Sequence, residues 1–149
     1  FPYTTLFRSY KVVNIKATLL DGKYHDVDSS EMAFKLAARL SYKAGIPEAK
    51  PILLEPIMNV TVKVPDEFTG TIIGDFNKRR GAIMGMDMVD GYQEITAQVP
   101  LAEIQKYPIE LRAMTQGRGV YSQSFDRYEP VPSNIADGII AQHKKEIEE

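Results

Sequence analysis

The chain has 149 residues, of which 44% are hydrophobic and 26% are charged, a balance typical of a folded globular protein rather than a disordered one. It has no cysteine, which excludes disulfides and thiolate metal sites and makes the reducing cytoplasm the expected compartment. The formal charge of −2 gives no overall attraction to nucleic acid, so RNA binding would need a local basic patch. No apolar run reaches the ~18 residues of a membrane span, and no membrane partner is expected.

The N-terminal part of the chain predicts a short hairpin. Residues 1–9 show no hydrophobic period, and we interpret them as a non-native leader. Residues 13–19 alternate apolar and polar side chains, as a half-buried strand does. Asp21 and Gly22 favour a tight turn, so residues 23–27 are expected to form a short returning strand.

A helix is predicted directly after this hairpin. Asp28 is its expected N-cap, with Glu31 three residues later at the spacing of a capping box. Gly45 and Pro47 are expected to end it. Its apolar face comprises Met32, Leu36 and Leu40. Prolines bracket residues 49–56, where we place a domain boundary.

The clearest strand and helix of the chain follow the boundary. The inward-facing residues of the strand are Met58, Val60, Val62 and Val64. Pro65 suits the first position of a helix, and the apolar stripe of that helix is Phe68, Ile72 and Phe76. Gly70 and Gly74 leave another helix face without side chains, which we expect to lie against the sheet or a partner.

A second hairpin follows that helix. Gly81 is expected to close the helix, and residues 83–88 form the next strand. Asp90 and Gly91 provide the turn into a third strand. The inward-facing residues of the third strand are Ile95, Ala97 and Val99.

Two prolines divide the second helix into two pieces. Pro100 opens a short piece, and Pro108 restarts the helix, because proline is tolerated at a helix start but not inside it. The last strand covers residues 120–128, and a final amphipathic helix carries Ile135, Ile139 and Ile147. The order βαββαβ predicts an α+β fold, a ferredoxin-like split βαβ sandwich followed by a C-terminal helix.

Two segments combine glycine with basic residues. The candidate RNA-binding residues in them are Lys78, Arg79, Arg80 and Arg118. Such side chains bind phosphates through charge-assisted hydrogen bonds. The alternative is structural: cations at a helix C-terminus complement the helix dipole by about 0.3–1 kcal/mol each, and Gly117 and Gly119 supply a loop with positive φ. The residues alone leave both interpretations open.

Catalytic and cofactor sites are not predicted. No GxxxxGK[ST] phosphate loop is present, so nucleotide hydrolysis of that class is excluded. His25 and His143 have no partner at a metal-ligand spacing, and we interpret both as ordinary exposed histidines. An acylphosphatase needs an anion-binding loop after the first strand, where Asp66 and Glu67 would instead repel phosphate.

An RNA-recognition motif is also disfavoured, although it shares this topology. That motif stacks bases on aromatic side chains of the two central strands. The outward positions of those strands are Asn59, Thr61, Lys63, Glu94, Thr96 and Gln98, and none is aromatic. RNA binding would therefore depend on the four basic residues named above.

Seven short motifs in a fixed order carry a family resemblance. They are Val12-Val13, residues 21–31, residues 55–58, Asn77-Lys78-Arg79-Arg80-Gly81, residues 99–103, residues 110–112 and Thr115-Gln116-Gly117-Arg118-Gly119. Together they resemble the C-terminal part of bacterial elongation factor G, from Tyr10 to about Lys144, with Glu110 where the family usually has Asp. The resemblance does not include residues 1–9.

The resemblance implies a domain organisation. Residues 10–49 would be the end of domain IV, a partial ribosomal-protein-S5-domain-2-like β/α segment. Residues 50–131 would be domain V, and residues 132–149 a helix packing back on domain IV. The family is a ribosomal translocase that requires GTP and Mg. The implied fragment has no catalysis and no cofactor of its own, and its partners would be large-subunit rRNA near the stalk base and the parent's other domains.

Two alternatives remain open at this point. A tetracycline-type ribosomal protection protein shares the architecture, although the complete Asn-Lys-Arg-Arg-Gly and Thr-Gln-Gly-Arg-Gly signatures favour the translocase. A free-standing ferredoxin-like binding domain is the second alternative. Ser122, Gln123 and Ser124 occupy positions that are usually apolar in the family, which leaves open a housekeeping factor or a divergent paralogue.

Overall fold

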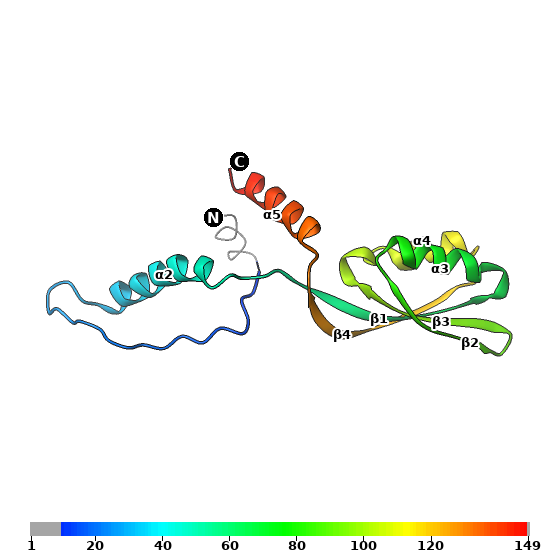
Figure 1. Cartoon of the computed structure of the whole chain (residues 1–149), viewed down its shortest axis with the longest axis horizontal. Helices are drawn as coiled ribbons and strands as arrows, with labels where there is room; N and C mark the ends of the chain where they lie inside the picture. The colour runs from blue at the N-terminus through cyan, green and yellow to red at the C-terminus, as the bar shows by residue number, and fades with distance from the viewer. Residues whose placement is uncertain (1–9, 149) are drawn as a thin grey trace. The chain divides into compact units, whose positions relative to one another are not determined.

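The computed structural model describes residues 10–148, and their side chains as far as residue 142. The interpretation of residues 1–9 as a leader therefore lies outside the described residues. The chain divides into two compact units. We call Leu54–Val131 the sheet unit, and Phe1–Leu53 with Pro132–Glu149 the flanking unit. Figure 1 shows the course of the chain through both.

The sheet unit contains one four-stranded antiparallel sheet. Its strands are β1 (Leu54–Pro65), β2 (Ala82–Val89), β3 (Tyr92–Pro100) and β4 (Val120–Pro130). They lie in the order β2-β3-β1-β4, so β1 is central and pairs with both β3 and β4. This order and the βαββαβ sequence of elements confirm the predicted ferredoxin-like split βαβ sandwich.

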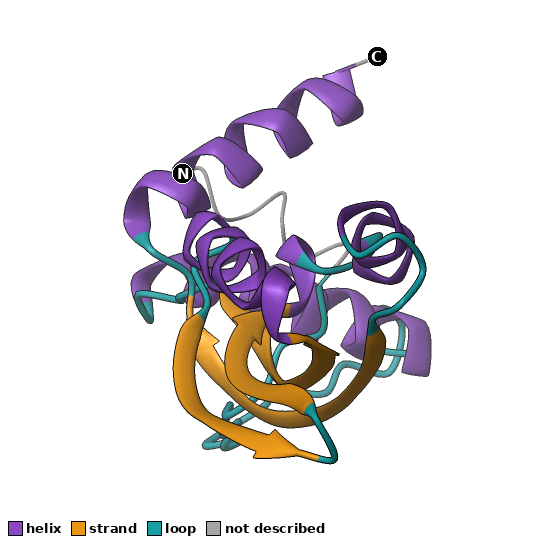
Figure 2. Cartoon of the chain, turned by 90° about the vertical axis from the view of Figure 1, so that its right-hand side faces the viewer, coloured by secondary structure: helices purple, strands orange, loops and turns teal. Residues whose placement is uncertain are grey.

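Two helices cover one face of this sheet (Figures 1 and 2). The first is α3 (Thr69–Lys78), preceded by a 3₁₀ turn at Asp66–Phe68. The second is α4 (Tyr107–Met114), preceded by a 3₁₀ turn at Leu101–Glu103. The predicted division into two pieces is confirmed, but Pro100, predicted to open the first piece, is instead the last residue of β3. Pro65, predicted at a helix start, is instead the last residue of β1, because it has extended backbone angles.

The core lies between the sheet and the two helices, and it contains the side chains expected there. The fully buried ones include Val60, Val62, Val64, Ile72, Phe76, Ile95, Ala97, Val99 and Tyr107. The rings of Phe76 and Tyr107 stack with centroids 5.4 Å apart. Phe68 is half-buried against this cluster. The predicted register of both central strands is therefore confirmed.

The glycine face of α3 is open, which corrects one part of the prediction. A Cβ placed at Gly70 or Gly74 would have no atom within 4 Å apart from the neighbouring backbone of its own helix. The face therefore does not pack against the sheet. The helix is instead held by the opposite stripe, which contains the buried residues Ile72 and Phe76. That the glycine face meets a partner stays a prediction.

The flanking unit contains α2 (Glu31–Glu48), with two differences from its predicted ends. Ser30 rather than Asp28 is the N-cap, because Ser30 has extended backbone angles and its Oγ accepts a hydrogen bond from the Ala33 amide at 3.1 Å. Pro47 lies inside the last turn, which continues to Glu48. Gly45 is also helical, since one glycine lowers helix stability by only about 1 kcal/mol.

The predicted hairpin at residues 13–27 is wrong, because no strand forms between residues 10 and 30 of the described chain. Leu19 and Leu20 are each 91% exposed, so their apolar surface is not covered. An isolated two-stranded hairpin is marginal in water, and the alternating pattern alone does not supply a third strand or a core. The apolar face of α2 is likewise exposed at Met32, Leu36 and Leu40.

The chain ends in α5 (Ser133–Glu148). Ile135 and Ile139 are half-buried as the amphipathic pattern predicts, and Ile140 is the buried residue of this helix among the described side chains. The side chain of Ile147 lies outside the described residues. Packing of this helix on domain IV stays a prediction. Among the described residues, none of the helices combines the length and apolar character needed to cross a membrane.

Candidate nucleic-acid interface

The first basic segment lies at the C-terminal end of α3, where the chain turns sharply into β2. Arg80 has φ of 58°, so it and not Gly81 adopts the left-handed conformation that ends the helix. The Gly81 amide donates to the Phe76 carbonyl at 2.8 Å. A Cβ at position 81 would lie 2.9 Å from that oxygen and 3.1 Å from the Val99 side chain. Gly81 is therefore required for close approach rather than for positive φ.

The guanidinium of Arg80 is held by two carboxylates. Its two terminal nitrogens each donate to one oxygen of Glu55 at 2.8 Å, in the bidentate geometry that suits these groups. Its Nε donates to Glu103 at 3.1 Å. The Glu55 residue is only 9% exposed, and hydrogen bonding to it raises the pKa of Arg80. Arg80 thus connects the end of α3 to the start of β1 and to the turn after β3.

Arg79 is held in a similar way on the neighbouring side. It donates to Asp75 at 2.7 Å, to the backbone carbonyl of Glu103 at 2.7 Å and to Glu110. Its guanidinium carbon lies 5.0 Å from the ring centre of Tyr107. Burial lowers the pKa of Arg79, but the hydrogen bonds to Asp75 and Glu110 raise it overall. Its side chain is only 18% exposed.

These contacts go beyond the helix-end role considered for Arg79 and Arg80, in which the cations only complement the helix dipole. Each bonds to residues more than twenty positions away. Arg80 connects the end of α3 to β1 at Glu55, and Arg79 connects it to α4 at Glu110. Removing one partner of a buried ion pair leaves an uncompensated charge. Their first role in this structure is therefore to hold the sheet unit together.

Lys78 and Arg118 differ from these two because they are exposed. Lys78 lies in the last turn of α3 and forms no ion pair with any residue that the structure describes. Arg118 pairs with Glu67 at 2.7 Å, and its guanidinium lies 4.7 Å from the ring centre of Phe68. Because Glu67 is 60% exposed, this surface pair contributes little to stability and can exchange for another anion.

The glycine-rich loop that presents Arg118 is built from two different requirements. Gln116 and Gly117 have φ of 53° and 79°, so Gly117 serves the expected left-handed turn. Gly119 does not have positive φ. A Cβ at position 119 would lie 2.9 Å from both the Leu111 side chain and the Thr115 hydroxyl. The Gly119 amide also donates a hydrogen bond to that hydroxyl at 2.9 Å. Thr115 is fully buried, so the loop is anchored against α4.

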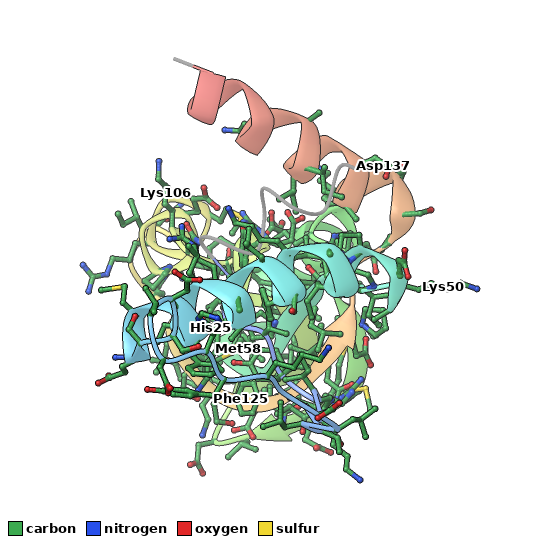
Figure 3. All side chains as sticks on the ribbon, turned by 90° about the vertical axis from the view of Figure 1, so that its left-hand side faces the viewer. His25, Lys50, Met58, Lys106, Phe125 and Asp137 are labelled. Carbon is green, nitrogen blue, oxygen red and sulfur yellow. The ribbon has the colours of Figure 1, made fainter. Side chains whose placement is uncertain are left out.

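The helix layer also carries basic residues that the sequence analysis did not select. Arg112 is exposed in the last turn of α4. Lys106 is exposed directly before that helix, and its side chain points away from the ribbon in Figure 3. The amphipathic spacing of α4, in which Leu111 is buried and its neighbour Arg112 is not, was the signal that could have identified Arg112.

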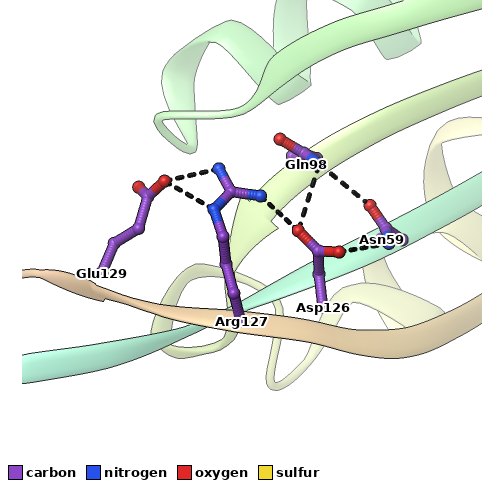
Figure 4. A network of polar contacts seen from close by, with 5 residues as sticks. All are labelled: Asn59, Gln98, Asp126, Arg127 and Glu129. Carbon is purple, nitrogen blue, oxygen red and sulfur yellow. Dashed lines mark hydrogen bonds and ion pairs between the residues drawn. The ribbon is translucent and has the colours of Figure 1, made fainter.

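The opposite, open face of the sheet is unsuited to an RNA backbone. Asn59, Gln98 and Asp126, from three neighbouring strands, join in one hydrogen-bond network, with Asn59 and Gln98 each 3.2 Å from Asp126 (Figure 4). Arg127 is neutralised by Asp126 and Glu129 in the same network. Lys63 pairs with Glu94 at 2.8 Å. The cations of this face are thus satisfied internally. Among the outward positions of its two central strands, all within the described residues, the one aromatic side chain is Tyr92 at the start of β3, so no pair of rings is available for base stacking.

The described residues contain no group of three or more His, Cys, Asp or Glu that could hold a metal ion. His25 is exposed and lies 3.6 Å from Asp28, an ordinary surface contact. The side chain of His143 lies outside the described residues. Tyr107 is fully buried, and burial raises its pKa, but its ring packs in the core between Phe76 and Tyr121. The candidate interface is therefore the basic helix layer alone.

Comparison with known proteins adds three findings. Residues 52–139 match the family described as elongation factor G C-terminus. Residues 6–50 match elongation factor G, domain IV, so the likeness begins four residues before Tyr10. A crystal structure of a protein from Thermus thermophilus is 40% identical, with a TM-score of 0.72, over 84% of this chain. This chain spans 19% of that protein's length.

Proposed function

This chain belongs to the elongation factor G family, and we propose that it supplies ribosome contacts during translocation of tRNA and mRNA, without hydrolysing GTP itself. The observation that carries the proposal is the succession of two matches, domain IV and then the C-terminus, along one chain. That succession favours a piece of an elongation factor over a free-standing ferredoxin-like domain. It also supports the translocase over a ribosomal protection protein, because both matched descriptions are of elongation factor G.

The proposed RNA-facing residues are Lys78 and Arg118, joined by Arg112. All three are exposed and belong to the helix layer or its loop. Each can approach a phosphate without breaking a buried ion pair, since Arg118 gives up only its surface contact with Glu67. Arg79 and Arg80 contribute indirectly by fixing the end of α3 on which Lys78 stands.

The test is the salt dependence of binding to large ribosomal subunits or to a stalk-base RNA. Each phosphate contact that is lost should reduce the slope of log affinity against log salt by about 0.7–0.9. We expect Lys78→Ala combined with Arg118→Ala to reduce both affinity and slope while the melting temperature stays close to that of the parent. The matched control is Lys63→Ala with Arg127→Ala on the open face, which should bind as the parent does. Equal binding by all three proteins would refute the proposal.

The absence of catalysis is tested separately. Phosphate release from GTP should show no turnover that depends on this chain, with or without ribosomes, because the sequence has no phosphate loop. GTP and Mg are proposed to act in the longer family members only. A ribosome-stimulated rate from the isolated chain would contradict this part of the proposal.

A further inference from the structure

The outer edge of β2 is an unprotected strand edge. β2 is the terminal strand in the order β2-β3-β1-β4, so only one side of it pairs within the sheet. After an irregularity between Ile83 and Gly85, residues 85–89 pair with β3 in unbroken register, and all five are exposed. The unpaired N–H and C=O groups of such an edge can form a ladder with another extended chain.

The side chains along this edge are unusually apolar for exposed positions. Met84, Met86 and Met88 are 60%, 49% and 59% exposed. Met86 and Met88 share one face of the sheet, because they lie opposite Ile95 and Gln93 of β3. Methionine is flexible and polarisable, and it is common on surfaces that adapt to a protein partner.

A single carboxylate lies between these two methionines on the other face. Asp87 lies opposite Glu94, whose own carboxylate is paired with Lys63 at 2.8 Å. Asp87 itself has no ion pair with any residue in the described part of the chain. The segment 82–90, which covers β2 and the start of its turn, contains no basic residue. The edge therefore presents negative charge without a counter-charge.

The opposite edge of the sheet, formed by β4, carries more charged side chains, so β2 is the edge that is better suited to pairing with another strand. Along β4, the charged groups of Asp126, Arg127 and Glu129 pair with each other. Charged side chains on an edge strand discourage the addition of another strand. β2 has one charged residue in eight, Asp87, and no proline or lysine.

We propose that the outer edge of β2 binds an extended polypeptide segment in which a lysine or arginine is flanked on both sides by apolar residues. Side chains alternate along an added strand, so apolar residues would meet Met86 and Met88 while the base meets Asp87. An RNA backbone does not fit this edge, since phosphates would face Asp87. A second copy of the chain also fits poorly, because its β2 brings another aspartate and no base. The proposal does not depend on the ribosomal role.

The experiment uses the full isotopically labelled chain and a capped synthetic peptide of about seven residues that alternates valine and lysine, long enough for one strand. Amide chemical shifts measured during the titration should change at residues 85–89 and not along β4. A peptide with glutamate in place of lysine should bind about fivefold or more weakly, from the cross-strand charge pair. A lysine peptide methylated on alternate backbone nitrogens should not bind.

Two charge variants complete the test. Asp87→Lys should reverse the preference, so that the glutamate peptide binds better than the lysine peptide. The matched control Asp66→Lys makes the same charge change at an exposed position after β1 and should keep the parent's preference. The shift map of each free variant verifies its fold. Absence of binding, shifts outside β2, equal affinity for both peptides or self-association through β2 would each overturn the proposal.

Discussion

Two segments of this chain carry the same alternating pattern and have opposite outcomes. Residues 58–64 become the centre of β1, with Val60, Val62 and Val64 fully buried. Residues 13–19 alternate equally well, yet they form no strand, and Ile15 is 51% exposed. β1 has a partner strand on each side and two helices over its apolar face. Alternation therefore specifies which face of a strand is buried, but neighbouring elements decide whether the strand forms.

The largest contrast between the two units should come from removing a phenylalanine ring in each. Phe76→Ala should lower the free energy of unfolding by about 3–5 kcal/mol, because the ring is fully buried and stacked on Tyr107. The matched change Phe34→Ala in α2 removes a ring that is 49% exposed and should cost far less. Urea denaturation of both variants checks this. Similar losses would mean that α2 packs as tightly as α3.

The second contrast concerns arginine. Arg80→Ala should lower the free energy of unfolding by about 1.5–3 kcal/mol, because it leaves the buried Glu55 without its bidentate partner. Arg39→Ala removes an exposed arginine of α2 and should stay within about 0.5 kcal/mol of the parent. Thermal melts of the two variants decide the matter. An unchanged melting temperature for Arg80→Ala would show that the bonds to Glu55 do not stabilise the sheet unit and that Arg80 acts only as a helix cap.

Replacing glycine with alanine should change stability in opposite directions in the two units. Gly81→Ala should destabilise by about 1–3 kcal/mol, since the new Cβ would lie 2.9 Å from a backbone oxygen. Gly45→Ala, inside α2 with no atom beyond the neighbouring helix backbone within 4 Å of the new Cβ, should increase helix stability by about 0.5–1 kcal/mol. Circular dichroism during thermal unfolding measures both. If Gly45→Ala reduced the helical signal, α2 would be packed in a way that the structure does not show.

The smallest expected effect is a loss of stability of the sheet unit at alkaline pH, caused by ionisation of Tyr107. Burial raises the pKa of Tyr107 above its ordinary value of 10.0, so the unfolded chain releases this proton first. The stability contributed by neutral Tyr107 is present below that value and falls as the pH rises above it. The melting temperature of Tyr107→Phe should therefore fall less than that of the parent between pH 9 and pH 11. If the melting temperatures of the variant and the parent fell equally over this pH range, the Tyr107 hydroxyl would have to be exposed to water.

The sequence predicted local features well and long-range contacts poorly. The inward residues of β1 and β3 and the stripe of α3 follow from periodicity, which depends only on neighbouring residues. The ion pairs of Arg80 do not, because Glu55 lies 25 residues before it and Glu103 lies 23 residues after it. From the sequence alone, a basic run at a helix end is interpreted as a helix cap, because the carboxylates that bind it are close only in the folded structure. The same limit explains Gly119, whose constraint comes from Leu111 and Thr115 rather than from its own φ.

Hydrogen exchange of the full chain tests the contrast between the two units most directly. Backbone amides that open only with global unfolding exchange slowly, whereas amides without a stable ladder exchange almost freely. We predict that the Val60 and Val62 amides of β1 are protected at least about a thousandfold more than those of Ile15 and Leu19. Equal protection of residues 13–19 and β1 would contradict the account, because it would require a packed strand where the structure has none.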